Sequence, residues 1–283
     1  MIYIKSPKEI EKMKEACRVA FFAQKAIEAA IKPGITTYEL DKIAEETMRK
    51  YGAIPAEKGY PSGVDGVPDF PASICSSVND VVIHGIPSKR EVLKEGDIVS
   101  VDLVAYKDGF NGDCCRTYAV GKIDKASQRL IDVTKQAFFE GIKYAKKGNR
   151  LGDISHAIGE YVEKNGFSVV REFQGHGIGR EMHEDPGIPN YGKAVRRHGA
   201  YQTTVHGERV GHYKTWTWYD IGNRTNGNCR KTKHFRTRWW LGNYNRRWNK
   251  SSTLWKYNFN YRKRAKNLDY SVKMVYTILA IYS

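Results

Sequence analysis

Two aspartates stand in neighbouring apolar stretches that a turn sequence separates. Asp102 interrupts Ser100-Val101-Asp102-Leu103-Val104, and Asp113 follows in Asn111-Gly112-Asp113-Cys114. Because Lys107-Asp108-Gly109 between them is typical of a hairpin turn, we expect paired strands with both carboxylates on one face. Neighbouring carboxylates in a β core repel and lose hydration unless a cation or a proton intervenes. The hairpin therefore indicates a metal site; the alternative is a pair of partly exposed turn aspartates bonded to backbone amides.

Three histidines flanked by glycine or proline are further candidate ligands. The glycines of Gln174-Gly175-His176-Gly177-Ile178-Gly179 predict a loop, and His176 lies in it. His183 precedes Glu184-Asp185-Pro186, and His84 ends an apolar run before a glycine. Each histidine alone is more often structural than a ligand, but together with the aspartate pair they favour metal binding. Carboxylate and imidazole ligands suit Mn²⁺, Fe²⁺, Co²⁺ or Zn²⁺. The sequence contains no CxxC pair, P-loop, G-x-S-x-G or H-E-x-x-H motif that would indicate another chemistry.

The elements that must position these residues are predicted from capping signals and hydrophobic spacing. Ser6-Pro7-Lys8-Glu9 and Thr36-Thr37-Tyr38-Glu39 are typical helix starts. Later helices are predicted at 126–147 and at 153–165, the second with Asp153 as its cap. Strands are predicted at 72–78, 81–83, 97–106, 110–120 and 167–173, and a glycine- and proline-rich loop at 58–71. Short strands beside amphipathic helices predict an α+β fold with a largely antiparallel sheet.

Over residues 1–193 the sequence resembles the type I methionine aminopeptidases. The resemblance rests on VNDVVIHGIP at 78–87, DIVSVDLVAYKDGFNGDCCRTYAVG at 97–121 and GHGIGREMHEDPGIPNYG at 175–192. It implies the pseudo-two-fold pita-bread fold of the creatinase and aminopeptidase group, which is compatible with the α+β prediction. Residues 1–193 would then form the catalytic domain, and the C-terminal half of the fold would be incomplete.

Position by position, the resemblance implies a dinuclear site for two divalent metal ions (Co, Mn, Fe or Zn). Its metal ligands would include Asp102, Asp113 and His176. His84 and His183 would be the catalytic residues that contact the substrate and the tetrahedral intermediate, and the methionine pocket would contain Phe70, Cys75 and Met182. Such ions polarise the scissile carbonyl and activate a water, while histidines that titrate near neutrality move protons. The implied reaction is hydrolytic release of the N-terminal methionine from nascent chains, with preference for a small second residue.

The composition changes sharply at about residue 193. Residues 194–283 hold 19 of the 47 lysines and arginines but only 3 of the 31 aspartates and glutamates, so the first 193 residues are balanced at 28 of each. All six tryptophans lie in the same basic tail: Trp216, Trp218, Trp239, Trp240, Trp248 and Trp255. Basic residues interleaved with aromatics are typical of a nucleic-acid-binding surface, and this interpretation competes with a second one.

The genetic code supports a second interpretation, in which residues 194–283 result from a shifted reading frame. The family completes its metal site with glutamates in M-x-x-A-I-E-P and H-Y-E-N-T, and neither motif occurs here. Reverse translation read from the second base turns residues 219–227 into M-I-L-A-I-E-P-M-V, 236–243 into E-L-D-G-G-W-V-T and 252–258 into A-H-Y-G-N-T-I. These are family segments in the family order, although Trp255 forces glycine where the family has glutamate. We therefore interpret 194–283 as a frameshifted, poorly ordered segment, expect no nucleic-acid binding, and expect the chain as written to be inactive.

Two further functions stay open, because fold alone does not separate them. The missing glutamates favour a catalytically dead relative that acts as a binding module. A proline-specific aminopeptidase shares the fold, but the short N-terminal region argues against the extra domain of those enzymes. The odd cysteine count and the lack of a secretory signal or a membrane-spanning stretch predict a cytoplasmic protein. The expected partners are N-termini of nascent polypeptides near the ribosome, with no membrane and the chain as a monomer.

Overall fold

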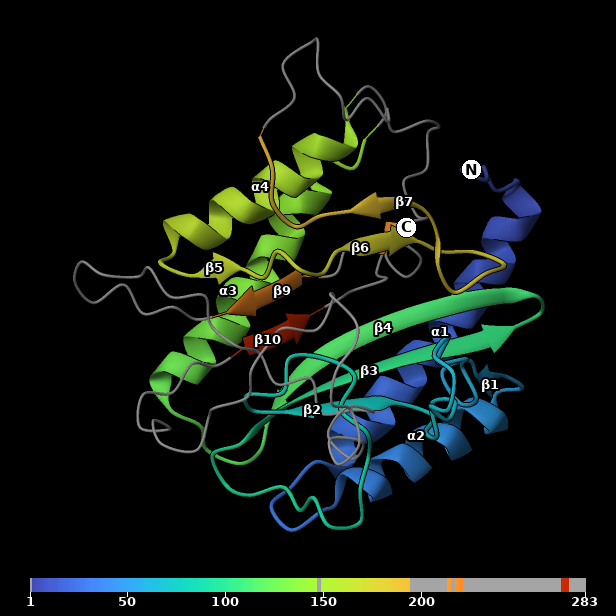
Figure 1. Ribbon diagram of the computed structural model, residues 1–283, viewed down its shortest axis with the longest axis vertical. Helices are drawn as coiled ribbons and strands as arrows, with labels where there is room; N and C mark the ends of the chain where they lie inside the picture. Colours follow the sequence, from blue (N-terminus) through green and yellow to red (C-terminus); the bar gives the residue numbers. More distant parts are fainter. Residues whose placement is uncertain (1, 147–148, 194–212, 215–216, 221–270, 275–283) are drawn as a thin grey trace.

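The structure is a computed structural model that describes residues 2–146, 149–193, 213–214, 217–220 and 271–274 (Figure 1). Its helices are α1 (Pro7–Ala30), α2 (Thr37–Lys50), α3 (Lys125–Ile142) and α4 (Leu151–Lys164). Its strands are β1 (Ile54–Pro55), β2 (Cys75–Val78), β3 (Ile98–Lys107), β4 (Phe110–Ala119), β5 (Ser168–Val169), β6 (Gly175–Gly177), β7 (Glu184–Ile188), β8 (Tyr213–Lys214), β9 (Thr217–Asp220) and β10 (Ser271–Met274). None of the helices described is long and apolar enough to cross a membrane.

The described strands form three sheets, and the neighbouring strands within each sheet are antiparallel. β3 is the centre of the first sheet and pairs with β1, β2 and β4. The other two sheets run β10-β9-β5 and β7-β6-β8. In Figure 1, α1 and α2 lie beside the first sheet, and α3 and α4 lie beside the shorter strands. The predicted α+β architecture with antiparallel strands is confirmed.

The first two helices begin where the capping signals predict. Ser6 and Thr36 are the N-caps, and each is closed by a glutamate three residues on. α1 packs closely on β4 because Gly112 has no side chain: a Cβ there would lie 2.3 Å from the carbonyl carbon of Ala16. The buried amide of Gln24 then joins α1 to the sheet by donating hydrogen bonds to the carbonyls of Val101 and Cys114, both at 2.9 Å.

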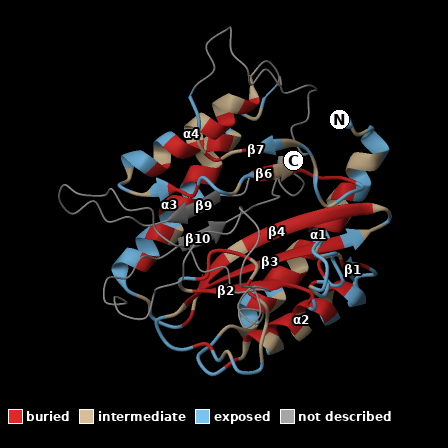
Figure 2. Ribbon diagram, viewed as in Figure 1, coloured by how far each residue is buried: buried red, intermediate tan, exposed pale blue. Residues whose placement is uncertain are grey.

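Both faces of the β3–β4 hairpin are covered. Val101 and Leu103 of β3 belong to the core that α1 and α2 complete, and β10 packs on β3 and β4. As a result, residues 98–105 of β3 and 110–115 of β4 are all buried (Figure 2). An acidic side chain on either strand must therefore find its partners inside the protein rather than in water.

Several predicted boundaries are wrong. α3 ends at Ile142 rather than 147, and Asp153 is not the cap of α4 but lies in its first turn, where it accepts a hydrogen bond from the backbone of Arg150 at 2.9 Å. The strand predicted at 167–173 is reduced to β5, and residues 81–83 lie outside the named strands. Val82 and Ile83 pack instead against Cys115 and Val170 in a small apolar cluster. The apolar residues at 81–83 are therefore explained by side-chain packing rather than by strand pairing.

Most of the basic tail lies outside the described residues. The prediction that residues 194–283 are poorly ordered therefore falls mostly on residues that the structure does not describe. The described part consists of three short strands. β8 pairs with β6, while β9 joins β5 to β10. The domain boundary at 193 therefore stays a prediction.

Candidate metal centre

Strand alternation separates Asp102 from the helix-facing core. Because Val101 and Leu103 point toward α1 and α2, Asp102 between them points to the opposite face. Asp102 is paired with Cys115, and Asp113 with Val104. Residues directly opposite or two apart share a face, so Asp102 and Asp113 are diagonal neighbours on one side of the sheet. Both carboxylates are buried, with exposed fractions of 1% and 0%.

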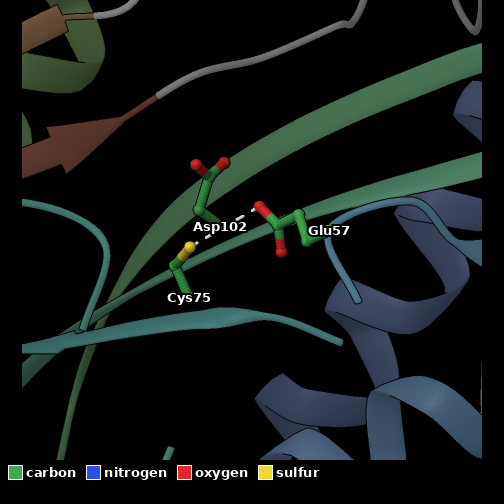
Figure 3. A group of neighbouring side chains, drawn as sticks. All are labelled: Glu57, Cys75 and Asp102. Carbon is green, nitrogen blue, oxygen red and sulfur yellow. Dashed lines mark hydrogen bonds between the residues drawn. The ribbon is translucent and has the colours of Figure 1, made fainter. Parts of the chain in front are cut away.

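The structure brings Asp102 together with two residues from other elements (Figure 3). Ligand atoms of Glu57, Cys75 and Asp102 all lie within 4.8 Å of one another. The Cys75 thiol donates a hydrogen bond to Oε1 of Glu57 at 3.7 Å. In the described part of the chain, this is the only group of three acidic, histidine or cysteine residues to meet that distance. Its members differ from the predicted set of Asp102, Asp113 and His176, whose ligand roles stay a prediction.

Glu57 was not predicted, and the contacts that hold it are distant in sequence. The next residue, Lys58, donates to both carboxylate oxygens of Glu45 on α2, at 2.9 and 2.8 Å. Arg49 and Lys42 also pair with Glu45, at 2.9 and 3.2 Å. Burial raises the pKa of Glu45, but these three cations outweigh it and lower the pKa to about 2. The ionised carboxylate therefore anchors the loop of Glu57 to α2.

A second carboxylate of α2 orients β2. Oδ1 of Asp41 accepts hydrogen bonds from the backbone amides of Ser73 at 2.7 Å and Ile74 at 3.2 Å, directly before Cys75. Burial raises the pKa of Asp41, and the two amide hydrogen bonds oppose that rise. Helix α2 thus holds two of the three residues drawn in Figure 3 in place, Glu57 through Glu45 and Cys75 through Asp41.

Two of the predicted histidines lie side by side. The ring centroids of His176 and His183 are 4.4 Å apart. Nδ1 of His183 lies 2.9 Å from the hydroxyl of Tyr60, whose ring meets the imidazole edge-on. Nδ1 of His176 lies 2.7 Å from the carbonyl oxygen of Gly177 on β6. His176 lies on β6, in a stretch whose glycines had predicted a loop, and His183 directly precedes β7.

His84 occupies an unusual backbone conformation beside β2. Its φ of 53° lies in the left-handed region that non-glycine residues rarely adopt. The following Gly85 is pressed against β2, where Ser76 donates a backbone hydrogen bond to its carbonyl at 2.7 Å. A Cβ on Gly85 would lie 1.9 Å from the Ser76 carbonyl oxygen. This contact holds the half-buried His84 at one place next to the strand that carries Cys75.

The predicted pocket residues come from two different places. Phe70 and Cys75 share a buried apolar cluster with Ala72, against which Ile86 packs. Met182 is half-buried in the segment between β6 and β7, next to His183. The structure therefore joins Phe70 and Cys75, and places Met182 with the histidines.

The donor set fits a divalent cation. Glu57, Asp102 and Asp113 are three buried carboxylates, and buried negative charges are costly unless a cation offsets them. Carboxylate and imidazole groups are ligands for first-row divalent metals, and a thiol adds affinity for zinc. The four described cysteines are buried, and none of them forms a disulfide: Cys17, Cys75, Cys114 and Cys115.

A buried carboxylate-rich centre on an antiparallel α+β scaffold is typical of a metal-dependent hydrolase, and the family comparison agrees. The sequence model of metallopeptidase family M24 matches residues 11–209. The chain belongs to this family.

Individual proteins that are similar to this chain include methionine aminopeptidases and an Xaa-Pro dipeptidase. The methionine aminopeptidase of Clostridium acetobutylicum is 53% identical over 196 residues, which are 69% of this chain and 76% of the relative. The crystal structure of methionine aminopeptidase from Thermotoga maritima has a TM-score of 0.70 and 41% identity, and covers 78% of this chain and 84% of its own. An Xaa-Pro dipeptidase from Bacillus anthracis has a TM-score of 0.60 and 26% identity, with 77% and 54% covered. These findings confirm the resemblance to methionine aminopeptidases and the pita-bread fold.

Proposed function

We propose that the chain descends from, and is built as, an enzyme that hydrolytically removes N-terminal methionine from newly made proteins. The observation that carries the proposal is the pair Asp102 and Asp113, buried on one face of β3–β4 in a member of a metallopeptidase family. Relatives that are 53% and 48% identical to this chain are named methionine aminopeptidases, which supports the same substrate class for this chain.

In the proposed mechanism, Asp102, Asp113 and His176 hold two divalent ions of the Mn, Fe, Co or Zn type. When bound, such ions supply Lewis-acid polarisation of the scissile carbonyl and activation of a water. Where the hydroxyl of Tyr60 donates to Nδ1 of His183, the neutral ring carries its proton on Nε2, and this atom would donate to the developing oxyanion. The phenyl ring of Phe70 offers the methionine side chain an apolar surface.

His84 has a separate role in the proposed mechanism. Its backbone is fixed against β2 by the Gly85 contact, which limits how far the ring can move. A ring held in this way can orient the substrate main chain at little entropic cost. We therefore assign His84 to substrate binding and catalysis, together with His183, and not to metal binding.

Two competing functions receive less support. A proline-specific peptidase is disfavoured because this chain is 26% identical to the Xaa-Pro dipeptidase, against 41% for the Thermotoga methionine aminopeptidase. A catalytically dead binding module is suggested by the missing family glutamates. However, an inert relative has no need to keep several buried carboxylates, which cost stability without a cation.

The proposal includes a setting for the reaction. The substrates are N-termini of nascent polypeptides emerging near the ribosome, and the enzyme acts in the cytoplasm as a monomer. Residues 194–283 are a frameshifted reading, so their basic and tryptophan-rich composition has no role in nucleic-acid binding. The nucleotide sequence around codon 193, read for a missing or inserted base, tests this part of the proposal.

The activity is tested on a frame-restored chain, in which the shifted reading replaces residues after 193 and the forced glycine at the codon of Trp255 is changed to glutamate. We expect release of methionine from Met-Ala and Met-Gly peptides after addition of Mn²⁺, Fe²⁺ or Co²⁺. The same preparation treated with chelator is the control, and Ala-Pro peptides test the prolidase alternative. Cleavage of Ala-Pro instead of Met-Ala would overturn the assignment.

A further inference from the structure

The segment that carries His183 is attached to the N-terminus of the chain. Nζ of Lys5, directly before the N-cap of α1, forms an ion pair with Oε2 of Glu184, the residue after His183. The two side chains are only 7% and 5% exposed, although 179 positions separate them in the sequence. A buried pair of this kind is costly to break on one side only, because the remaining charge is left without compensation.

We define the His183 loop as residues 178–183, between β6 and β7. This loop packs directly on the Lys5–Glu184 ion pair. A Cβ on Gly179 would lie 2.5 Å from both Oε1 of Glu184 and Cε of Lys5, so the loop backbone rests against both partners. The same Oε1 of Glu184 accepts a hydrogen bond from the Glu181 amide at 3.3 Å. Glu184 therefore connects Lys5 to Gly179 and Glu181 in the loop that presents His183.

The opposite side of the loop is held by the aspartate hairpin. Asn111, two residues before Asp113, donates to the carbonyl of Gly179 from its backbone at 2.8 Å. Its side-chain amide donates to the carbonyl of Arg180 at 2.9 Å. The guanidinium of Arg180 in turn donates to Glu9 on the first turn of α1, at 3.0 Å. The loop is thus held between the N-terminal segment and the strand that carries Asp113.

From these contacts we infer that Lys5 is a positioning residue for His183. The Lys5–Glu184 ion pair fixes the start of β7 and with it the imidazole that lies beside His176. The inference rests on the proposed function only for the role of His183 in catalysis; the attachment itself is a property of this chain. Catalytic geometry depends on such support, because a small displacement of a reacting group lowers the rate steeply.

The first test uses the full chain and needs no activity. Amide hydrogen–deuterium exchange is followed by mass spectrometry in Lys5→Met, in Lys5→Arg, and in Lys14→Met, whose exposed pair with Glu11 is a matched control. In Lys5→Met we expect exchange in the His183 loop to accelerate by about tenfold or more, with the β3–β4 hairpin unchanged. Lys5→Arg should restore slow exchange, and Lys14→Met should leave it unchanged.

A double variant separates positioning from general stability. Lys5→Met combined with Glu184→Gln removes the unpaired buried charge, so it should fold even where Lys5→Met alone does not. We expect the loop of the double variant to exchange faster than in the parent while the hairpin stays protected. Unchanged exchange in the loop would overturn the inference. So would loss of protection throughout the double variant, because that result assigns the pair to overall stability.

A kinetic test on the frame-restored chain links the positioning to catalysis. We expect Lys5→Met to lower kcat by about tenfold or more with little change in KM, and Lys5→Arg to recover most of kcat. Equal kcat in Lys5→Met and the parent would overturn the catalytic part of the inference. Absence of activity in the frame-restored parent would instead refute the proposed function, and the exchange experiment would still decide the role of Lys5.

Discussion

Asp102 points to the opposite face of β3 from its direct neighbours Val101 and Leu103. Val101 and Leu103 complete the core under α1 and α2, while Asp102 meets Glu57 and Cys75 on the other side. A one-residue slip of the register would exchange these environments and place a carboxylate in the apolar core. The continuous ladder from Ile98 to Lys107 against β4 prevents such a slip. At the scale of single residues, the chemistry of the site depends on strand alternation.

A pair of substitutions at this scale tests which side chains bind metal. In the frame-restored chain, Asp102→Asn should reduce bound metal, with affinity at least about tenfold weaker, because an anionic ligand is lost. His84→Ala should lower turnover and leave the metal content unchanged, because its proposed contact is to substrate. Elemental analysis after gel filtration, with turnover measured on the same samples, provides both readouts. Loss of metal from His84→Ala would contradict the assignment of this histidine.

Helix α2 is the element that supports the Glu57 side of the site. Its Glu45 pairs with Lys42, Arg49 and Lys58, and so ties the loop of Glu57 to the helix. The ion pairs lower the folded-state pKa of Glu45 from 4.5 to about 2, although burial opposes them. A carboxyl group with a lowered folded-state pKa contributes stability above its unfolded pKa and loses that contribution as the pH falls toward the folded value.

This linkage predicts how one substitution changes the pH dependence of stability. Between pH 4.5 and about 2, the free energy of unfolding of the frame-restored chain should fall more steeply than that of Glu45→Gln. Urea unfolding at a series of pH values measures both slopes. Glu11→Gln, which loses one exposed pair with Lys14, should keep the parental slope. Parallel slopes for Glu45→Gln and the parent would show that the three ion pairs add nothing to stability.

At the scale of the whole molecule, residues 1–193 and residues 194–283 differ in amino-acid composition. The family match ends at residue 209, and the sequence likeness to the Clostridium relative covers 69% of the chain. The formal net charge of +16 arises entirely beyond residue 193. Strong positive charge without sustained hydrophobic periodicity opposes compaction. The family covers the apolar faces of its sheets with elements of its C-terminal half. A tail that does not supply these elements therefore lowers the stability of the whole molecule.

The chain as written should therefore have little or no aminopeptidase activity. Two family glutamates are missing, and with fewer anionic ligands the second ion should bind weakly. Apolar surface that the family covers with its C-terminal half would be exposed, and the expressed protein should be prone to aggregation. Assays with excess Co²⁺ or Mn²⁺, beside the frame-restored chain, measure the activity, and sedimentation measures the aggregation. Turnover near that of the frame-restored chain would refute the frameshift hypothesis.

Local signals in the sequence were enough to predict where several helices and strands of this protein begin. The capping boxes at Ser6 and Thr36 and the turn at residues 107–109 act within four residues of the chain. The two helices and the strand that follows the turn begin where predicted. The same holds for the shared face of Asp102 and Asp113, since side-chain direction in a hairpin follows from strand period and turn length. The family motifs within residues 1–193 were likewise sufficient to predict the pita-bread fold.

Contacts between distant segments were decided only by the tertiary structure. Glu57 lies in a loop without regular periodicity, and its approach to Cys75 and Asp102 depends on the anchoring of Lys58 by α2. Lys5 and Glu184 are 179 positions apart, and nothing near either residue marks it as a partner. The glycines of 175–179 suggested a loop because β6 lacks apolar alternation, although the backbone pairs with β7. Periodicity reports only which side of an element is buried, so the partner across a buried interface is set by the packing of the whole chain.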